Sequence, residues 1–451
     1  MISVDATWDA ANSDLAKQPY VSLEIDGYAR KFTNRDPGIT DYYPWIAEDG
    51  VTDIEYNTSP LDGSSELQDV TVTVLDFQGL ITADMPSITL EGRTARIKVW
   101  FPGVDVSHAV TLFTGKLDLV QCSNVNTTYD FVLKDTRVDL KQLVYLTGDD
   151  GQPVDSSHLK TVVAHPLDIL KDILLNQLAL DTSLVDIATI DAYRDGPFAG
   201  AIFQFSIDSA PEAKDFIENQ LMKPLGGCLR STSSGILKPY FLISLAGSIS
   251  PVQSFDADEL VDIPLVGQSD IINTLDYKFD KEGSEYKSES VLTDADSIAK
   301  YGQATQIVES DGMRSGYQAF FLANIVSREI FNRLASKNPT FDAEVLWTGC
   351  KVEASDIISI THPLMPDRKA GVMGVTDAWF QVQSLKLSIS TFTATFTLVD
   401  VSTSRSYGAF KIAPDSQVDW TSATSDEKSK YMFIADATGK YSDTTTGNPL
   451  G

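Results

Sequence analysis

Short runs in which apolar and polar residues alternate dominate the first third of the chain, a pattern typical of β-strands with one buried face. Residues 20–25 alternate in this way. Asp26-Gly27 then supplies the positive backbone angles of a tight turn, and the pattern continues to Phe32. Four further strands are predicted at 70–74, 95–101, 112–120 and 129–133. Many short strands with regular turns indicate a barrel or a sandwich.

After Gly148-Asp149-Asp150-Gly151 the apolar spacing changes to three and four, which predicts helices. Pro166 suits the first position of a helix. The apolar face that follows consists of Leu167, Leu170, Ile173, Leu174 and Leu178. A second helix is predicted from Pro211, and Gly226-Gly227 follows its end. With a hairpin predicted over 228–243, this middle region is expected to be α+β.

A third region returns to strands, with alternation over 271–280 and closing strands predicted at 352–360, 379–389 and 391–399. One helix interrupts it, because Leu322, Val326, Ile330 and Leu334 share one face. Beyond Asp400 the chain is rich in Ser, Thr, Asp and Gly, which predicts an extended tail. The fold class is therefore mainly β with α+β inserts. The expected division is a first β domain at 1–147, an α+β region at 148–262, a second β domain with one helix at 263–404, and the tail at 405–451.

The composition excludes some classes of protein. The chain has 63 acidic and 35 basic residues and a formal charge of −28, whereas a protein that grips phosphates needs a basic face. The hydrophobic share of 43% and the charged share of 22% are typical of globular proteins. Three dispersed cysteines are too few for a disulfide framework. Neither a secretory signal at the start nor an apolar run long enough to span a bilayer is expected.

A search for catalytic and metal-binding residues predicts none. His158 and His165 lack ligands at zinc spacing, so a surface or capping role is favoured, and His362 is expected in a loop. His108, the fourth histidine, has no predicted role. The cysteines Cys122, Cys228 and Cys350 fall in apparent strands, where a buried thiol is the ordinary state.

Carboxylates and glycines give no stronger signal. Asp294-Ala295-Asp296-Ser297 resembles the opening of a calcium loop, but the glycine and the final glutamate of that loop are missing. The segment Gly148–Gly151 is expected to be a loop, and Gly226-Gly227 to end a helix rather than to cradle phosphate. No catalytic, cofactor-binding or metal-binding residue is assigned, no cofactor is expected, and the chain is predicted not to be an enzyme.

Four passages, taken in order, resemble the baseplate or tail-tip hub family of double-stranded DNA phages. Residues 112–118 (LFTGKLD) and 131–135 (FVLKD) with Leu140 are similar to the "F-x-G-x-[IL]-D … D … L" strand pair of the first hub barrel. Residues 273–279 (NTLDYKF) resemble the "N-x-[VL]-x-[VY]-x-[YF]" strand that opens the second barrel. Residues 296–302 (DSIAKYG) loosely match "D-x-x-S-x-x-x-Y-G", and 353–362 (EASDIISITH) match "E-x-G-D-[IV]-[IV]-x-[IL]-x-H". Ser355 stands where the family often has Gly, so a less tight turn is expected there.

The resemblance covers about residues 15–415 and implies a homotrimeric hub at the virion tail tip, assembled in the cytoplasm of the bacterial host. Each subunit would contribute two similar hub-type β-barrels to a ring of six. The implied partners are the distal tail or tail tube ring protein, a central fibre or spike protein, and the tape measure protein. DNA would pass through without specific binding, and the acidic charge would repel it from the wall.

Two other functions compete with the hub. A receptor- or carbohydrate-binding tail protein would use exposed aromatic residues, but the tryptophans are scattered along the chain, as expected of core or interface residues: Trp8, Trp45, Trp100, Trp347, Trp379 and Trp420. A cell-wall hydrolase of the tail tip would need paired acids in a cleft or a set of His and Cys residues.

Overall fold

The structure is a computed structural model. It describes residues 2–13, 18–67, 69–123, 127–243, 250–262, 265–268, 270–336, 339–367 and 372–400, together with 411–412, 422, 424 and 431–432. The chain divides into two compact units, Met1–Asp400 and Val401–Gly451. In the second unit a short parallel pair is described, β24 (Lys411–Ile412) with β25 (Tyr431–Met432). Most of the predicted tail, including Trp420, lies outside the described residues.

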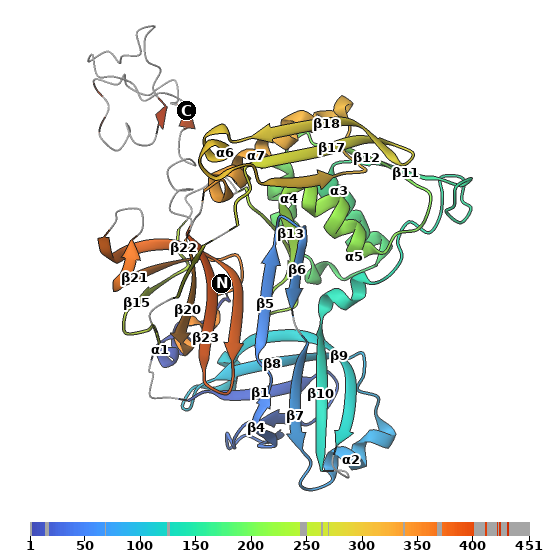
Figure 1. The fold of residues 1–451 in the computed structure, drawn as a ribbon. Coiled ribbons are helices and arrows are strands. Elements are labelled where there is room, and N and C mark those ends of the chain that lie inside the picture. The colour runs from blue at the N-terminus through green and yellow to red at the C-terminus, as the bar shows by residue number, and fades with distance from the viewer. Residues whose placement is uncertain are drawn as a thin grey trace. The chain divides into compact units, whose positions relative to one another are not determined.

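The first large sheet contains eight strands in the order β3-β2-β1-β8-β9-β10-β7-β4 (Figure 1). Their bounds are β1 (Tyr20–Ile25), β2 (Lys31–Thr33), β3 (Tyr42–Tyr43), β4 (Ile46–Val51), β7 (Val70–Leu75), β8 (Thr94–Trp100), β9 (Val110–Ser123) and β10 (Thr128–Asp135). The predicted β1–β2 hairpin is confirmed, with Gly27 at φ 73° in its turn. Short helices border this sheet: α1 (Ala6–Asn12), α2 (Leu80–Asp84), η1 (Met85–Ser87), η2 (Val106–His108) and η3 (Thr136–Leu140).

Gly115 shows why the first motif needs a glycine. It lies on β9 opposite Asp135 of β10. A Cβ atom at this position would lie 2.3 Å from the carbonyl oxygen of Lys134 and 2.6 Å from the ring of Phe113. The close approach of the two backbones therefore requires a residue without a side chain.

The second large sheet has the strand order β15-β21-β22-β23-β20-β16, to which β5 and β6 are added. The bounds are β5 (Ile54–Ser59), β6 (Ser64–Leu67), β15 (Gln253–Asp256), β16 (Leu265–Gln268), β20 (Pro339–Leu346), β21 (Ile357–Asp367), β22 (Val372–Ser388) and β23 (Thr393–Asp400), with η9 (Trp347–Lys351) between β20 and β21. Tyr56 of β5 pairs with Leu385 of β22, so a strand from the early chain completes a late sheet (Figure 1). One continuous apolar core contains residues of both large sheets, among them Phe131 and Phe396.

The predicted class, mainly β with helical inserts, is confirmed. In the described residues, however, the strand order of neither large sheet returns to its first strand. The predicted middle helices are also present: α3 begins at Pro166, and the second begins at Ala213, two residues after Pro211.

The middle region has its own apolar core, which it shares with part of the third region. Its elements are β11 (Lys160–Ala164), α3 (Pro166–Lys171), η4 (Asp172–Gln177), η5 (Thr182–Leu184), α4 (Ile187–Asp195), β12 (Phe203–Ile207), α5 (Ala213–Asp215), η6 (Phe216–Met222), η7 (Lys223–Leu225), β13 (Gly227–Ser231) and β14 (Leu237–Phe241). The third region adds β17 (Thr274–Glu282), β18 (Glu285–Thr293), α6 (Ala295–Tyr301), β19 (Thr305–Glu309), η8 (Ser315–Tyr317) and α7 (Ala319–Leu334).

The placement of β17 corrects one expectation. It was predicted to open the second barrel, but it lies in a separate three-stranded sheet with the order β18-β17-β19. Its buried residues Leu275, Tyr277 and Phe279 belong to the core of the middle region. The reason is that its apolar face packs on α7 and on the middle region, where the Phe279 ring contacts Phe320 of α7 and the Tyr277 hydroxyl donates to the Pro224 carbonyl oxygen. No helix in the described residues has both the length and the hydrophobicity needed to cross a membrane.

Candidate functional site: a buried junction with two arginine–carboxylate pairs

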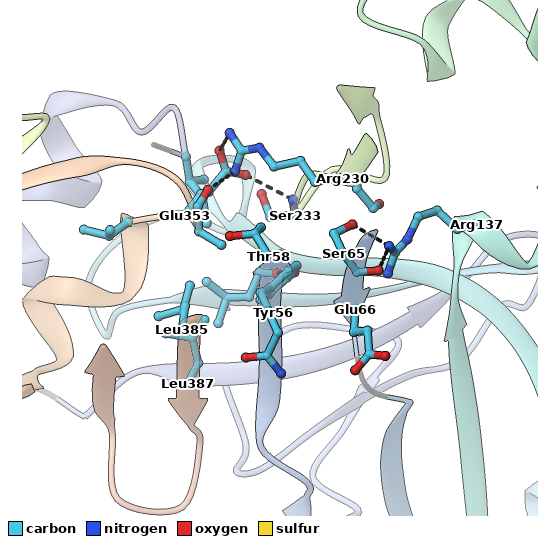
Figure 2. A pocket seen from close by; sticks show the side chains of 16 residues that line it. Tyr56, Thr58, Ser65, Glu66, Arg137, Arg230, Ser233, Glu353, Leu385 and Leu387 are labelled. Carbon is cyan, nitrogen blue, oxygen red and sulfur yellow. Dashed lines mark hydrogen bonds and ion pairs between the residues drawn. The ribbon is translucent and has the colours of Figure 1, made fainter. Parts of the chain in front are cut away.

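Segments far apart in the sequence of Met1–Asp400 meet around a small cavity, which we call the junction (Figure 2). The cavity volume is about 20 Å³, room for about one water molecule. It is lined by Ile2, Tyr56, Asn57, Thr58, Ser65, Glu66, Leu112, Arg137, Arg230, Ser231, Ser233, Val352, Glu353, Ala354, Leu385 and Leu387. Strands β5 and β6, helix η3, strand β13 and the segment before β21 thus all contribute side chains.

The first pair, Arg137 with Asp135, is local in sequence. Asp135 ends β10 and caps η3, because its carboxylate accepts a hydrogen bond from the Arg137 backbone N–H at 3.2 Å. The Arg137 Nε atom donates to the same carboxylate. Its Nη1 atom donates to the Ser65 carbonyl oxygen and, at 2.5 Å, to the Ser65 hydroxyl (Figure 2). Arg137 therefore connects the end of β10 with β6 through hydrogen bonds.

The second pair, Arg230 with Glu353, joins segments that are distant in sequence. Arg230 lies on β13, and its Nη2 atom is 3.9 Å from the Glu353 Oε2 atom. Its Nη1 atom donates to the Ala354 carbonyl oxygen, and the Ser233 N–H donates to Glu353 Oε1 at 3.2 Å. The Arg230 Nε atom is buried and has no hydrogen-bond partner in the described part of the chain. This ion pair therefore connects the middle region with the second sheet, and its two side chains are in less close contact than Arg137 and Asp135.

Burial and charge shift two pKa values at the junction. Burial by itself raises the pKa of Glu353, but the positive charge of Arg230 and the Ser233 N–H bond hold that pKa below its usual value. Burial raises the pKa of the Tyr56 hydroxyl well above its usual value, and the negative charges of Glu353 and Asp135 add to the effect. Glu353 is therefore ionised, and Tyr56 neutral, at neutral pH.

The turn around Glu353 is tight, contrary to the expectation from Ser355. The Asp356 N–H donates to the Glu353 carbonyl oxygen at 3.1 Å, and the Glu353 N–H donates to the Asp356 carboxylate at 2.9 Å. Ser355 closes this turn at φ 74°, in the left-handed region that favours glycine. The serine therefore adopts a backbone conformation that is unfavourable for a residue with a side chain, and the turn remains tight.

A third arginine, Arg333, connects α7 with the same region. Arg333 is 8% exposed, and its Nη1 atom donates to the Gln381 side chain of β22 at 2.5 Å. Its Nη2 atom donates to the Leu242 carbonyl oxygen at 2.7 Å. Gln381 in turn donates to the Tyr240 hydroxyl. The helix, the β14 segment and the second sheet are connected through these contacts.

The histidines are not brought together. His165 caps α3, as predicted, by accepting from the Leu167 N–H at 3.1 Å, and burial lowers its pKa. His158 lies 2.5 Å from Asp150, whose hydrogen bond raises the pKa of the imidazole. His108 lies 2.5 Å from Asp5. His362 lies on β21 and not in a loop, because its segment pairs with β22.

The cysteines and tryptophans differ in burial. Cys228 is buried on β13, where burial raises its pKa to about 12. Two cysteine predictions are wrong: Cys122 is exposed on β9, and the buried Cys350 lies in η9, a 3-10 helix. Trp8, Trp45, Trp100 and Trp347 are buried. Most tryptophans in the described residues are therefore core side chains.

The calcium-like segment is a helix cap. Asp294 accepts from the Ser297 N–H at 2.8 Å and caps α6. The buried Asn273 side chain donates to the Ser297 hydroxyl at 3.1 Å and to the Gly302 carbonyl oxygen at 2.7 Å. Two of the four motif passages therefore form one structural unit. Within the described ranges, no group of three His, Cys, Asp or Glu side chains could hold a metal ion.

Sequence reasoning missed several of these residues. Arg137, Arg230 and Arg333 were not singled out, although a charged residue in an apolar strand or on the apolar side of a helix is a signal for a buried ion pair. Asp294 was also not recognised as the cap of α6, although it stands three residues before Ser297. The capping rule, an Asp three residues before a hydrogen-bonded N–H, could have identified it.

Comparison with known proteins gives structural similarities at low sequence identity. No protein-family model and no curated protein sequence matches the chain. A 43 kDa tail protein of prophage MuSo2 from Shewanella oneidensis is 12% identical, with 86% of this chain and 99% of that chain covered and a TM-score of 0.48. The prophage tail protein gp18 from Listeria monocytogenes is 10% identical, with 84% and 94% covered and a TM-score of 0.46.

A tail protein from Neisseria meningitidis is 11% identical, with 85% of this chain and 96% of that chain covered and a TM-score of 0.42. Each of the three is described as a tail protein, the kind of protein that the motif order resembles. Identities of 12% or less and TM-scores below 0.5 leave the function to be argued from the residues of the chain itself.

Proposed function

We propose that the chain is a structural protein of a bacteriophage tail, the hub at the tail tip or baseplate. The observation that carries this proposal is the junction. Asp135 belongs to the first hub-like passage and Glu353 begins the last one, and each holds an arginine at the same cavity. Two of the four hub-like passages therefore supply the carboxylates of one junction between sheets, as expected of a rigid structural protein.

The proposed assembly is a homotrimer in which each subunit presents two β regions to a ring of six. Two eight-stranded sheets in one chain support this arrangement. One face of the ring would bind the distal tail or tail tube ring protein, and the other a central fibre or spike protein, with the tape measure protein as a further partner. The domain division at 147, 262 and 404 belongs to the same proposal.

The acidic charge fits a conduit for DNA. With a formal charge of −28, an acidic channel wall that repels DNA is the expected arrangement. The chain would therefore line the exit channel without holding the nucleic acid. A structure of the assembled tail tests this part, because a neutral or basic channel wall would contradict it.

Two measurements on the purified chain test the hub against its competitors. Light scattering is expected to give a trimer mass at high concentration or together with a ring or fibre partner. Zymography on cell-wall material is expected to show no clearing, and binding of cell-surface polysaccharide is expected to be undetectable. Clearing would favour a tail-tip hydrolase, and saturable polysaccharide binding by a monomer would favour a receptor-binding protein.

A further inference from the structure

Strand β18 is an edge strand with a free side. In the described residues it pairs with β17 alone, since the sheet order is β18-β17-β19 (Figure 1). Along Glu285–Thr293, the backbone N–H and C=O groups that point away from β17 are paired with no other described strand. Such an edge can accept an additional strand.

A groove lies at the Thr293 end of this strand, between the last residues of β18 and helix α7. Its volume is about 550 Å³, and its apolar lining includes Leu292, Phe321, Ile325 and Phe331. Phe321 is 59% exposed, which is unusual for a phenylalanine on the longest described helix. The groove therefore offers anchoring positions for apolar side chains.

Two charged residues line the groove, Asp294 and Arg328. The Asp294 carboxylate accepts a hydrogen bond from the Ser297 N–H at 2.8 Å as the cap of α6, whereas the Arg328 side chain is 73% exposed. The ion pair recorded for its guanidinium is a 3.7 Å contact with the neighbouring residue Glu329. In a chain with a formal charge of −28, a cation beside exposed aromatic rings favours a partner carboxylate.

We propose that this groove binds an extended, acidic peptide segment of a partner protein, which adds to the free edge of β18 as a further strand. Alternate side chains of an added strand would point toward α7, where Phe321 and Ile325 receive apolar groups and Arg328 receives a carboxylate. From Phe321 to Asn332 the helix rises about 16 Å, the length of about five strand residues. The proposal holds whether or not the chain is a tail hub.

The probe is the peptide Ac-TVTVTET-NH2, whose valines and glutamate share one face when it is extended. Binding is measured by fluorescence titration with a labelled peptide, and by hydrogen exchange of residues 285–293 in the full chain. The expected result is saturable binding that slows amide exchange within β18. The lysine version, Ac-TVTVTKT-NH2, is expected to bind at least about tenfold more weakly. A fully N-methylated version of the peptide, which cannot donate to the strand edge from either lateral side, is expected not to bind.

Variants of exposed residues locate the site without threatening the fold. Phe321→Ser is expected to weaken binding about tenfold or more, and Arg328→Glu is expected to reverse the preference toward the lysine peptide. Phe77→Ser removes a phenylalanine that is even more exposed, at 71%, and far from the groove in sequence, and is expected to leave peptide binding unchanged.

Three outcomes would overturn the proposal. The first is unchanged exchange in β18 at saturating peptide, or equal binding of the N-methylated peptide. The second is binding of an amphipathic helical peptide in the groove without protection of β18, which would assign the groove to a helix. The third is self-association of the chain that is lost in Phe321→Ser, which would assign the groove to a second copy.

Discussion

Arg137 and Arg230 lie at the same junction but hold their carboxylates in different ways. Arg137 binds Asp135 two residues away and adds two hydrogen bonds to Ser65, so its guanidinium is closely surrounded. Arg230 reaches Glu353 across 3.9 Å and leaves its Nε atom unpartnered in the described residues. The first pair is set by one strand end, whereas the second depends on how two parts of the chain are packed. Residues within one turn can therefore reach good hydrogen-bond geometry locally, whereas the geometry of an ion pair between distant segments is fixed by how those segments pack.

Arg137→Met is expected to have the largest effect on stability. It removes the partner of a buried carboxylate and the donors to Ser65, and breaking such a pair costs about 3–5 kcal/mol. Chemical denaturation followed by tryptophan fluorescence measures the change. Arg328→Met, at an exposed arginine, is the matched control and should change stability by less than about 0.5 kcal/mol. Equal losses of stability in Arg137→Met and Arg328→Met would contradict the structural role assigned to Arg137.

Arg230→Met should destabilise the chain by about 2–3 kcal/mol, less than Arg137→Met, because Glu353 keeps the Ser233 N–H as a partner. The double variant Arg230→Met/Glu353→Leu removes both charges and is expected to recover part of the loss. A loss of stability in the double variant equal to or greater than the sum of the losses in Arg230→Met and Glu353→Leu would show that the pair is not coupled as described.

Gly115→Ala tests the backbone that supports the local pair, since Gly115 lies opposite Asp135. The added methyl group would meet the Lys134 carbonyl oxygen, so a loss of about 2 kcal/mol is expected. Gly316→Ala is the control, because a Cβ atom there meets nothing within 4 Å. Thermal unfolding of both variants gives the comparison, and similar midpoints would refute the close approach.

Glu353→Gln should cost about 1 kcal/mol at neutral pH and change the pH dependence of stability. The pKa of Glu353 is held below its usual value in the folded chain, so its contribution is present above about pH 4.3 and is lost as the pH falls through the folded pKa. The variant should therefore lose less stability than the parent chain when the pH is lowered below about 4.3. If the stabilities of Glu353→Gln and of the parent chain fall in parallel as the pH is lowered, the lowered pKa of Glu353 is contradicted.

Ser355→Gly is expected to give the smallest effect and the opposite sign. The left-handed backbone at φ 74° suits glycine, and the buried Ser355 hydroxyl has no hydrogen-bond partner in the described residues, so a gain of about 0.5 kcal/mol is expected. Ser206→Gly, in the ordinary backbone of β12, should instead destabilise by about 0.5–1 kcal/mol. The thermal unfolding midpoints of Ser355→Gly and Ser206→Gly show whether stability rises in the first variant and falls in the second.

The sequence predicts much of the local structure but little of the long-range pairing. The hairpin at Asp26-Gly27 and the helix with Leu322 to Leu334 follow from spacing alone, because turn and face are local properties. The pairing of β5 with β22 and the separate sheet of β17 do not follow, since alternation marks a strand and not its neighbour. The carboxylates of the junction lie in passages that the family resemblance singled out. Their arginines were missed because Arg137 follows Asp135 and Thr136 and Arg230 precedes Ser231 and Thr232, so each stands beside polar residues and resembles a surface position.

Quantitative mass spectrometry of purified phage particles from cells that encode this chain is the decisive test of the proposed hub. We expect the chain in intact particles at about three copies, beside six copies of a ring protein, since the proposed trimer with two β regions per subunit matches a sixfold ring. Absence of the chain from particles that carry complete tails would contradict the account. So would a copy number in the hundreds, as expected of a tube or sheath protein.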